Sequence, residues 1–407
     1  MGLTTQFFQQ ISGVFGLLLA IIGLFLSSWI VIPAPTFSLL PLGVGAPELS
    51  PWLLSLNLLA TLLSAVSAGQ SWLYRVALGL SLVGLCLSCL PLVQFPAVQR
   101  QAEATLQRAL GRDYLEKIAS PQRVSLAAQP LNLARVFTGI SLPPIRPTGI
   151  QFAHPEGVPL RLEIYRPPTA GLHPTIVNIY GGAWKWGNPT QDDKFNRYMA
   201  GKGYTVIAID YRHAPRYRFP AQLQDVQTAL AFIWERVTEY GIDRDRVALL
   251  GRSAGAHLAM LTAFQPDALP VRAVVSYYGP INLTVGYREP PNPDPIDSRA
   301  VLQAFLGGSP DDFPELYRKA SPISWVRPDL PPTLLIYGGR DHIVQARYGR
   351  EMANLLQAQG NSAPFMEIPW AEHAFDAVFS GISNQLALYY TERFLGWALR
   401  PLEPSSD

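Results

Sequence analysis

The stretch VALLGRSAGAHLAMLTAF, residues 247–264, decides the fold. Its first four residues form a short apolar run typical of a buried strand, and residues 254–264 form an apolar helical run. Between them lies Gly251-Arg252-Ser253-Ala254-Gly255, a G-x-S-x-G pattern. In this strand–turn–helix context the turn raises a serine hydroxyl clear of the sheet, and only tiny side chains fit beside it. The pattern therefore predicts that Ser253 is a nucleophile rather than a structural serine.

Short apolar runs and helical stretches alternate on both sides of this turn. Strands are expected at 149–153, 160–165, 175–180, 204–209, 247–250, 271–277, 333–337 and 364–368, and helices at 220–240, 254–264, 344–358 and 382–399. The first two strands flank the turn cluster 154–157 and predict an opening hairpin. The alternation predicts an α/β class with a mostly parallel sheet covered by helices on both faces. Chemistry in such sheets sits at the carboxyl ends of the strands.

A serine nucleophile needs a base, and the chain has six histidines. Chain order in this architecture is serine, acid, histidine, which leaves His342 and His373. His373 lies in a loop between the last strand and the last helix, so we predict that it is the base. His342 directly follows an aspartate and is interpreted as lining its loop. The others are interpreted as structural or as surface and loop residues: His257 as structural, and His154, His173 and His213 as surface or loop.

The third catalytic member must hold the imidazole tautomer and stabilise the imidazolium. Asp341 follows the strand at 333–337 through Gly338-Gly339-Arg340, and it precedes His373 in the chain. It is the predicted acid. Its rival Glu372 is adjacent to the base and is interpreted as a surface carboxylate, and Asp376 is set aside on the same grounds.

An oxyanion hole needs backbone N–H groups aimed at one point. Tyr180-Gly181-Gly182-Ala183-Trp184 follows the strand at 175–180, and paired glycines let the backbone approach a ligand closely. Gly181 and Gly182 are predicted donors, joined by the N–H of Ala254. The alternative is a plain turn. Trp184, Trp186 and Tyr217 fit pocket walls and core packing equally well.

Together these motifs resemble the α/β-hydrolase superfamily, and within it the hormone-sensitive-lipase-like and carboxylesterase group, over about residues 148–399. The resemblance rests on the Tyr180–Trp184 motif, on Asp210-Tyr211-Arg212-His213-Ala214-Pro215 with Phe219-Pro220-Ala221, on the Ser253 turn and on Gly338-Gly339-Arg340-Asp341. The chain is also similar to the prenylcysteine-methylesterase branch, some members of which are membrane-tethered. The resemblance implies a Ser/Asp/His triad and acyl transfer to water without a cofactor.

One position departs from this family. Its oxyanion loop usually opens with histidine before the glycines, and here that residue is Tyr180. The backbone donors are kept, so hydrolysis is still expected. Packing beneath the loop must differ, which weakens the transfer of a substrate from the family.

The first 95 residues differ sharply in composition from the rest. The chain has 407 residues, 48% of them hydrophobic, and a net charge of +2. All charged residues except Glu48 and Arg75 follow Phe95. The near-neutral balance excludes an electrostatic case for nucleic-acid binding, and the high apolar content excludes disorder for most of the chain.

Three uncharged or nearly uncharged runs in this leader, at 11–32, 52–67 and 72–93, predict transmembrane helices. A cleaved signal peptide fits poorly, because no Lys or Arg precedes Ile11 and the run is too long. A buried soluble hairpin is the other alternative. The second run is short and allows a re-entrant segment, which leaves two spans open. Basic residues from Arg100 onward place the body on the cytoplasmic side.

The remaining features are the two cysteines of the leader and the segment that joins the leader to the body. Cys86 and Cys89, the only cysteines, are interpreted as small buried hydrophobes. Residues 97–119 predict an amphipathic helix that lies on the membrane or packs on the body, with Val98, Ala102, Leu106, Ala109 and Leu110 on one face. Residues 120–147 are interpreted as a linker.

The expected organisation is a transmembrane region at 1–95, an amphipathic helix and linker at 96–147, a catalytic domain at 148–400 and a tail at 401–407. The expected function is a membrane-anchored serine hydrolase of carboxylic esters, which acts through an acyl-enzyme on an apolar ester or lipid and needs no metal. The alternatives are a serine peptidase on the same fold and a non-catalytic membrane scaffold or receptor.

Overall fold

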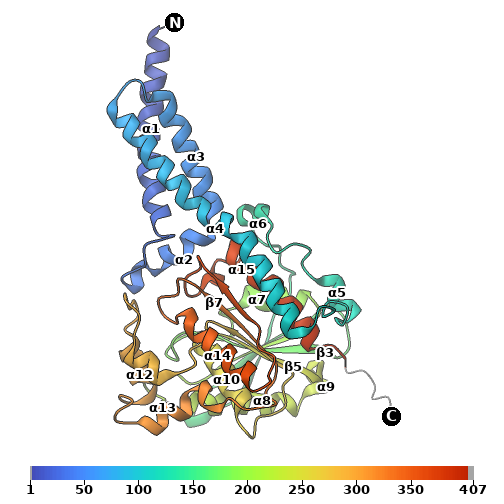
Figure 1. Ribbon diagram of the computed structural model, residues 1–407. Helices are drawn as coiled ribbons and strands as arrows, with labels where there is room; N and C mark the ends of the chain where they lie inside the picture. Colours follow the sequence, from blue (N-terminus) through green and yellow to red (C-terminus); the bar gives the residue numbers. More distant parts are fainter. Residues whose placement is uncertain (1, 402–407) are drawn as a thin grey trace.

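A computed structural model describes residues 2–401 of the chain (Figure 1). A bundle of long helices from the N-terminal quarter projects from one end of an α/β body. The expected tail at 401–407 lies, apart from residue 401, outside the described residues.

Three bundle helices are long and apolar enough to cross a membrane: α1 (Gly2–Ser28), α3 (Ser50–Ser67) and α4 (Trp72–Leu110). They match the three predicted runs in order. The first helix ends at Ser28, before Pro33 and Pro35. Between α1 and α3 lie a 3-10 turn, η1 (Phe37–Leu39), and the short helix α2 (Leu40–Glu48).

Small and polar side chains fill the centre of the bundle. The Asn57 amide nitrogen donates to the hydroxyls of Ser27 and Ser88, at 2.9 and 3.0 Å. Gly23 and Gly84 face this amide so closely that a Cβ atom at either position would collide with it. Interfaces of small residues with interhelical hydrogen bonds are typical of helices that associate in lipid.

The prediction that the third run ends near Pro91 and Pro96 is wrong. Helix α4 continues through both prolines to Leu110, so residues 97–110 of the expected separate helix are its final part, and residues 111–119 form turns instead of helix. Each proline removes a backbone donor and crowds the preceding turn, and packing of this end of α4 on the body offsets that cost. The predicted apolar face is buried, and this end of α4 packs on the body.

The body contains one eight-stranded sheet in the order β1-β2-β4-β3-β5-β6-β7-β8. Strand β2 pairs antiparallel with β1 and β4, and the remaining pairs are parallel. The strands are β1 (Thr148–Ala153), β2 (Leu160–Tyr165), β3 (His173–Ile179), β4 (Thr205–Ile209), β5 (Ile242–Arg252), β6 (Ala273–Tyr277), β7 (Thr333–Gly338) and β8 (Phe365–Ile368). All eight predicted strands are present, and the mostly parallel sheet is the predicted one.

Helices surround the sheet, as Figure 1 shows. They are α7 (Asp193–Gly201), α8 (Ala221–Trp234), α9 (Val237–Tyr240), α10 (Ala254–Phe264), α11 (Leu283–Arg288), α12 (Ser298–Leu306), α13 (Pro314–Ala320), α14 (Ala346–Ala358) and α15 (Ile382–Ala398), with the 3-10 turns η2 (Pro155–Gly157), η3 (Pro322–Trp325) and η4 (Phe375–Ala377). The predicted helix at 220–240 is divided into α8 and α9.

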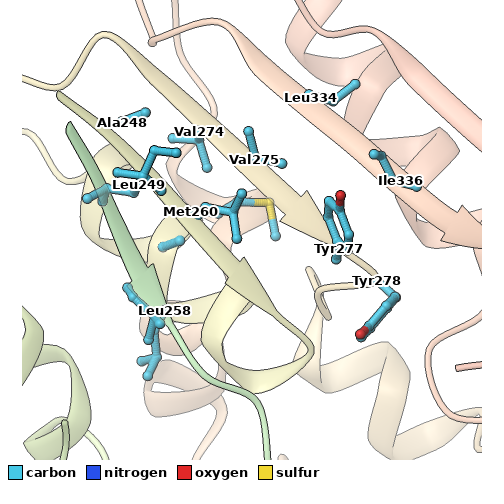
Figure 2. Close-up of a cluster of buried hydrophobic side chains, with 14 of the residues drawn as sticks. Ala248, Leu249, Leu258, Met260, Val274, Val275, Tyr277, Tyr278, Leu334 and Ile336 are labelled. Atoms are coloured by element: carbon cyan, nitrogen blue, oxygen red, sulfur yellow. The ribbon is translucent and has the colours of Figure 1, made fainter. Parts of the chain in front are cut away.

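Apolar side chains of the central strands and α10 form the core around the Ser253 turn. Figure 2 shows Ala248, Leu249, Val274, Val275 and Met260 packed together, and all five are fully buried. Burial on both faces explains why these strands are continuous apolar runs rather than alternating ones. The core therefore holds the carboxyl ends of β5 and β6 in fixed positions.

The segment expected to be a linker contains two short helices, α5 (Ser120–Ser125) and α6 (Leu133–Thr138). The indole nitrogen of Trp52 on α3 donates to the Val136 carbonyl of α6, at 3.2 Å. The prediction for the cysteines is wrong, because Cys86 is exposed and Cys89 is only half-buried. Both lie on the outer surface of an apolar bundle, where a small apolar side chain needs no partner.

Candidate active site

The Ser253 turn joins β5 directly to α10. Ser253 has φ of +50° and ψ of −120°, a conformation that non-glycine residues rarely adopt. A Cβ atom at Gly251 would collide with Gly255, and one at Gly255 would collide with the carbonyls of Ile179 and Tyr180. The two flanking glycines are therefore required for the tight turn that presents the serine, as the sequence pattern predicts.

The structure brings Ser253, His373 and Asp341 into one hydrogen-bonded chain. His373 Nε2 lies 3.0 Å from Ser253 Oγ, and His373 Nδ1 lies 2.8 Å from Asp341 Oδ2. Because an ionised carboxylate only accepts, Nδ1 carries the imidazole proton and Nε2 is left to accept from the serine hydroxyl. This arrangement can move a proton off Ser253.

Asp341 is held by its own loop after β7. Its Oδ1 atom accepts from the backbone N–H groups of Ile343 and Val344, at 2.8 and 2.7 Å. Burial raises the pKa of the Asp341 carboxyl, and the facing His373 and the N–H of Val344 act in the opposite direction. The two backbone donors fix the carboxylate so that only its Oδ2 atom faces the imidazole.

The predicted oxyanion loop lies beside the serine. A Cβ atom at Gly181 would meet the Arg252 carbonyl and Ser253 Cβ, so its backbone runs very close to the turn. Gly182 has φ of +135°, where an L side chain would also strike the Trp186 carbonyl. Both glycines line the same cavity as Ser253 and His373. Their backbone can therefore approach a substrate without a side chain in the way.

Tyr180, the residue that departs from the family pattern, takes part in a buried network beneath this loop. Its hydroxyl donates to Asp210 Oδ1 at 2.6 Å and lies 2.8 Å from His213 Nε2. Its ring stacks on Tyr211 with the ring centroids 4.5 Å apart, and the Tyr211 hydroxyl donates to the Tyr180 carbonyl. The network anchors the start of the glycine loop to the end of β4. His213 is thus half-buried and paired, not a free surface histidine.

The interpretation of Glu372 and Asp376 as surface carboxylates is wrong, although neither contacts the His373 ring by hydrogen bond. Glu372 is 3% exposed, and its carboxylate accepts from the backbone N–H groups of His342 and His373 and faces His342 Nδ1 at 2.6 Å. Glu372 therefore links the loop that carries Asp341 and His342 to the loop that carries His373. His342 lies in the loop between β7 and α14, next to Asp341, as predicted.

Asp376 belongs to a second buried charged cluster. It forms an ion pair with Arg252, the residue before the nucleophile, and accepts from the hydroxyl of Tyr278. Arg252 also pairs with Asp192 at 3.2 Å. The Tyr278 ring in turn lies 4.5 Å from the His373 ring. The sequence did not reveal this cluster, because its members are far apart in the chain. Only Arg252 lies in a recognised motif, as the variable residue before the serine of the G-x-S-x-G pattern.

His257 is structural, as predicted. It is fully buried on α10, where its Nε2 lies 2.7 Å from the Ala320 carbonyl and its Nδ1 accepts from the indole of Trp184. Burial lowers its pKa to about 4, so it stays neutral. His154 is exposed on a turn, and His173 is half-buried at the start of β3.

Two cavities of unequal volume meet at Ser253. The larger is about 550 Å³, and the smaller is about 70 Å³. Four residues line both cavities: Ser253, Ala183, Ile296 and Ile343. Trp186 lines the larger cavity and Trp184 the smaller. Within residues 2–401, no group of three or more His, Cys, Asp or Glu side chains is placed to hold a metal ion.

Comparison with known proteins agrees with this fold. The family described as BD-FAE matches residues 162–356. "Probable carboxylic ester hydrolase LipM" of Mycobacterium tuberculosis is 31% identical over 58% of this chain and 57% of its own length. "Probable isoprenylcysteine alpha-carbonyl methylesterase ICMEL1" of Arabidopsis thaliana is 27% identical over 50% of this chain and 46% of its own. The structure titled "Bacterial Heroin Esterase" superposes with a TM-score of 0.58 at 24% identity, over 66% of this chain and 89% of that one.

The mostly parallel sheet and the serine turn define an α/β hydrolase. The relatives named above support the hormone-sensitive-lipase-like esterase group of this superfamily. The chain spans only about half of the length of the curated relatives named here.

Proposed function

We propose that the chain is a membrane-anchored serine hydrolase that cleaves carboxylic esters. The observation that carries the proposal is the hydrogen-bonded chain from Ser253 through His373 to Asp341, of which Ser253 and His373 line the larger cavity. Esterases among its relatives support the reaction class.

In the first half of the reaction, Ser253 Oγ attacks the ester carbonyl carbon while its proton passes to His373 Nε2. The imidazolium formed is stabilised by Asp341, which also holds the ring in place. The tetrahedral intermediate then collapses. The bond to the alcohol oxygen breaks, that oxygen takes the proton from His373, and the acyl group stays on Ser253.

In the second half, water repeats these steps. His373 takes a proton from the water, whose oxygen attacks the acyl carbon. The bond to Ser253 Oγ breaks and the serine regains its proton, which releases a carboxylic acid. In both halves the negative oxygen faces the N–H groups of Gly181, Gly182 and Ala254, the proposed oxyanion hole. Removal of one such donor typically costs roughly 100- to 1,000-fold in kcat.

The inside-out polarity of the bundle supports membrane anchoring. Its buried positions include Ser27, Asn57 and Ser88, whereas Phe15 and Leu62 are more than half exposed. Water would favour the reverse, but lipid favours apolar side chains outside and hydrogen-bonded polar groups inside. The basic residues that follow the third span favour a cytoplasmic body. Protease treatment of sealed vesicles tests this side, because only an accessible body is digested.

The test of the reaction is hydrolysis of p-nitrophenyl esters by the full-length protein in detergent. The parent should hydrolyse them, and Ser253→Ala should lose several powers of ten in kcat, because the nucleophile is removed. Ser324→Ala, an exposed serine on η3, is the control and should match the parent. Folded parent protein that hydrolyses no ester would reject the proposal.

A further inference from the structure

One wall of the larger cavity comes from outside the hydrolase domain. The segment between the first two apolar helices, residues 29–49, is here called the α1–α3 connection. Two of its side chains, Phe37 and Leu40, line the cavity together with Ser253 and His373. A segment that would otherwise only link two membrane helices therefore lies against the reacting groups.

Apolar packing holds the connection against the body. Leu40 forms a small buried cluster with Ala34 and Val44, and Ile343 from the loop of Asp341 packs against that cluster. Near the mouth, the Phe37 ring meets the Trp186 ring edge-on, with centroids 6.3 Å apart. Ile343 and Trp186 line the cavity too, so leader and body form this part of the wall jointly.

Polar contacts hold both ends of the same segment. Near the start, the Arg340 guanidinium donates to the carbonyl of Val31. At the end of α2, Glu48 Oε2 accepts from the backbone N–H of Ser383 at 2.8 Å, at the start of α15. Glu48 is fully buried there. Contacts at both ends fix where Phe37 and Leu40 lie.

The charged groups that line the cavity near the nucleophile are paired with one another. Arg252 pairs with both Asp192 and Asp376. Apolar side chains make up most of the remaining lining, although Gln191, Asp193 and Lys194 also line the cavity. The apolar members include Phe37, Leu40, Trp186, Ile296, Ile343 and Phe379. Such a wall binds a hydrocarbon chain by removing its surface from water, and each buried methylene contributes a factor of about 4 in binding.

The two cavities also differ in what they can hold. Ser253 lines both, so the two arms of an ester bound at its carbonyl have separate cavities within reach. The cavity of about 70 Å³ fits a methyl or similarly small group, whereas the cavity of about 550 Å³ fits a long chain.

Resting on the ester hydrolysis proposed above, we propose that the α1–α3 connection selects the substrate. The preferred ester has one small arm and one long apolar arm, and the long arm lies against Phe37 and Leu40. Phe37 is then a specificity-determining residue supplied by the membrane region. This account gives the leader a role in substrate choice in addition to anchoring.

The test compares kcat/KM for long and short esters in full-length protein in detergent. Alkyl acetates lengthen the alcohol arm and methyl alkanoates lengthen the acyl arm, which identifies the arm that meets the wall. In one series the parent should prefer the long member. Phe37→Ala should lower its long-to-short ratio by about 4- to 15-fold, equivalent to one or two methylenes losing their contact. Phe15→Ala is the matched control, because Phe15 and Phe37 are both 57% exposed in the leader.

Hydrolysis of p-nitrophenyl acetate shows that each variant is folded and active. An unchanged long-to-short ratio in active Phe37→Ala would overturn the inference and leave ester hydrolysis standing. Equal losses for short and long esters, or the same change in Phe15→Ala, would also overturn it. A parent that hydrolyses no ester would reject the proposed function and the inference with it.

Discussion

At the residue scale, order along the chain predicted three side chains that the fold brings into one hydrogen-bonded chain, but it did not reveal the residues that support them. Ser253, Asp341 and His373 each follow a strand, so the parallel sheet brings them together at one edge. Arg252 and Asp376 are 124 residues apart and carry no motif of their own. A pairing that depends on two loops packing against each other leaves no local signal.

Tyr180 provides a prediction at this scale. Tyr180→Phe removes the hydroxyl that bonds Asp210 and faces His213, so two half-buried polar groups lose a partner. We expect the free energy of unfolding to fall by about 1–3 kcal/mol. We also expect kcat/KM to fall much less than the roughly 100-fold or more that follows removal of an oxyanion donor. The reason is that the N–H groups of the loop are kept.

Chemical denaturation and ester hydrolysis measure these two effects separately. Tyr217→Phe is the control, because Tyr217 is a half-buried tyrosine in the segment after His213, with its ring facing Arg212 and Arg216. If Tyr180→Phe kept full stability but lost most activity, the tyrosine hydroxyl would act in the reaction and the account of the network would be wrong.

At the scale of elements, periodicity and apolar content predicted all eight strands but misplaced the end of one helix. Prolines at 91 and 96 indicated a break, yet α4 continues to Leu110. Tertiary packing decides the matter, because Val98, Ala102 and Leu106 are buried against the body and hold the last turns. The role of the α1–α3 connection was equally invisible, since no motif in residues 29–49 shows that it reaches the cavity.

Two glycines on α4 test how the bundle is packed. A Cβ atom at Gly84 would collide with the Asn57 amide, whereas one at Gly79 would meet open space. Gly79→Ala should therefore raise stability by about 0.5–1 kcal/mol, through reduced backbone entropy in the unfolded chain. Gly84→Ala should lower it. Thermal unfolding in detergent measures both, and equal effects would contradict the close packing around Asn57.

Glu48 makes the docking of the leader depend on pH. Burial raises its pKa to about 8, and the Asp376 charge acts in the same direction. The folded state thus keeps a proton that the unfolded state loses above its ordinary pKa near 4.5. The stabilisation that comes from the neutral Glu48 carboxyl is fully present below about pH 4.5. It is lost as the pH rises through about 8.

We expect the unfolding temperature of the parent to fall by a few degrees more than that of Glu48→Gln between pH 5 and pH 8, because glutamine does not titrate. Glu351→Gln, an exposed position on α14, should follow the parent. Scanning fluorimetry at several pH values makes the comparison. Identical pH profiles for the parent and Glu48→Gln would contradict a buried neutral Glu48.

At the scale of the whole molecule, the bundle and the hydrolase body share one wall of the active site. Figure 1 shows α2 lying between them, at the end of the body from which the bundle projects. This arrangement supports the proposals that the chain is anchored in a membrane and that the anchor region takes part in substrate choice. Everything in this account depends on Ser253 being a reactive nucleophile.

Covalent labelling tests that claim most directly. A fluorophosphonate transfers its phosphonyl group to an activated serine oxygen and releases fluoride, without any assumption about the natural ester. Full-length protein should gain one phosphonyl group, located on Ser253, and Ser253→Ala should gain none. Folded protein that stays unlabelled, or a label on another serine that persists in Ser253→Ala, would contradict that claim.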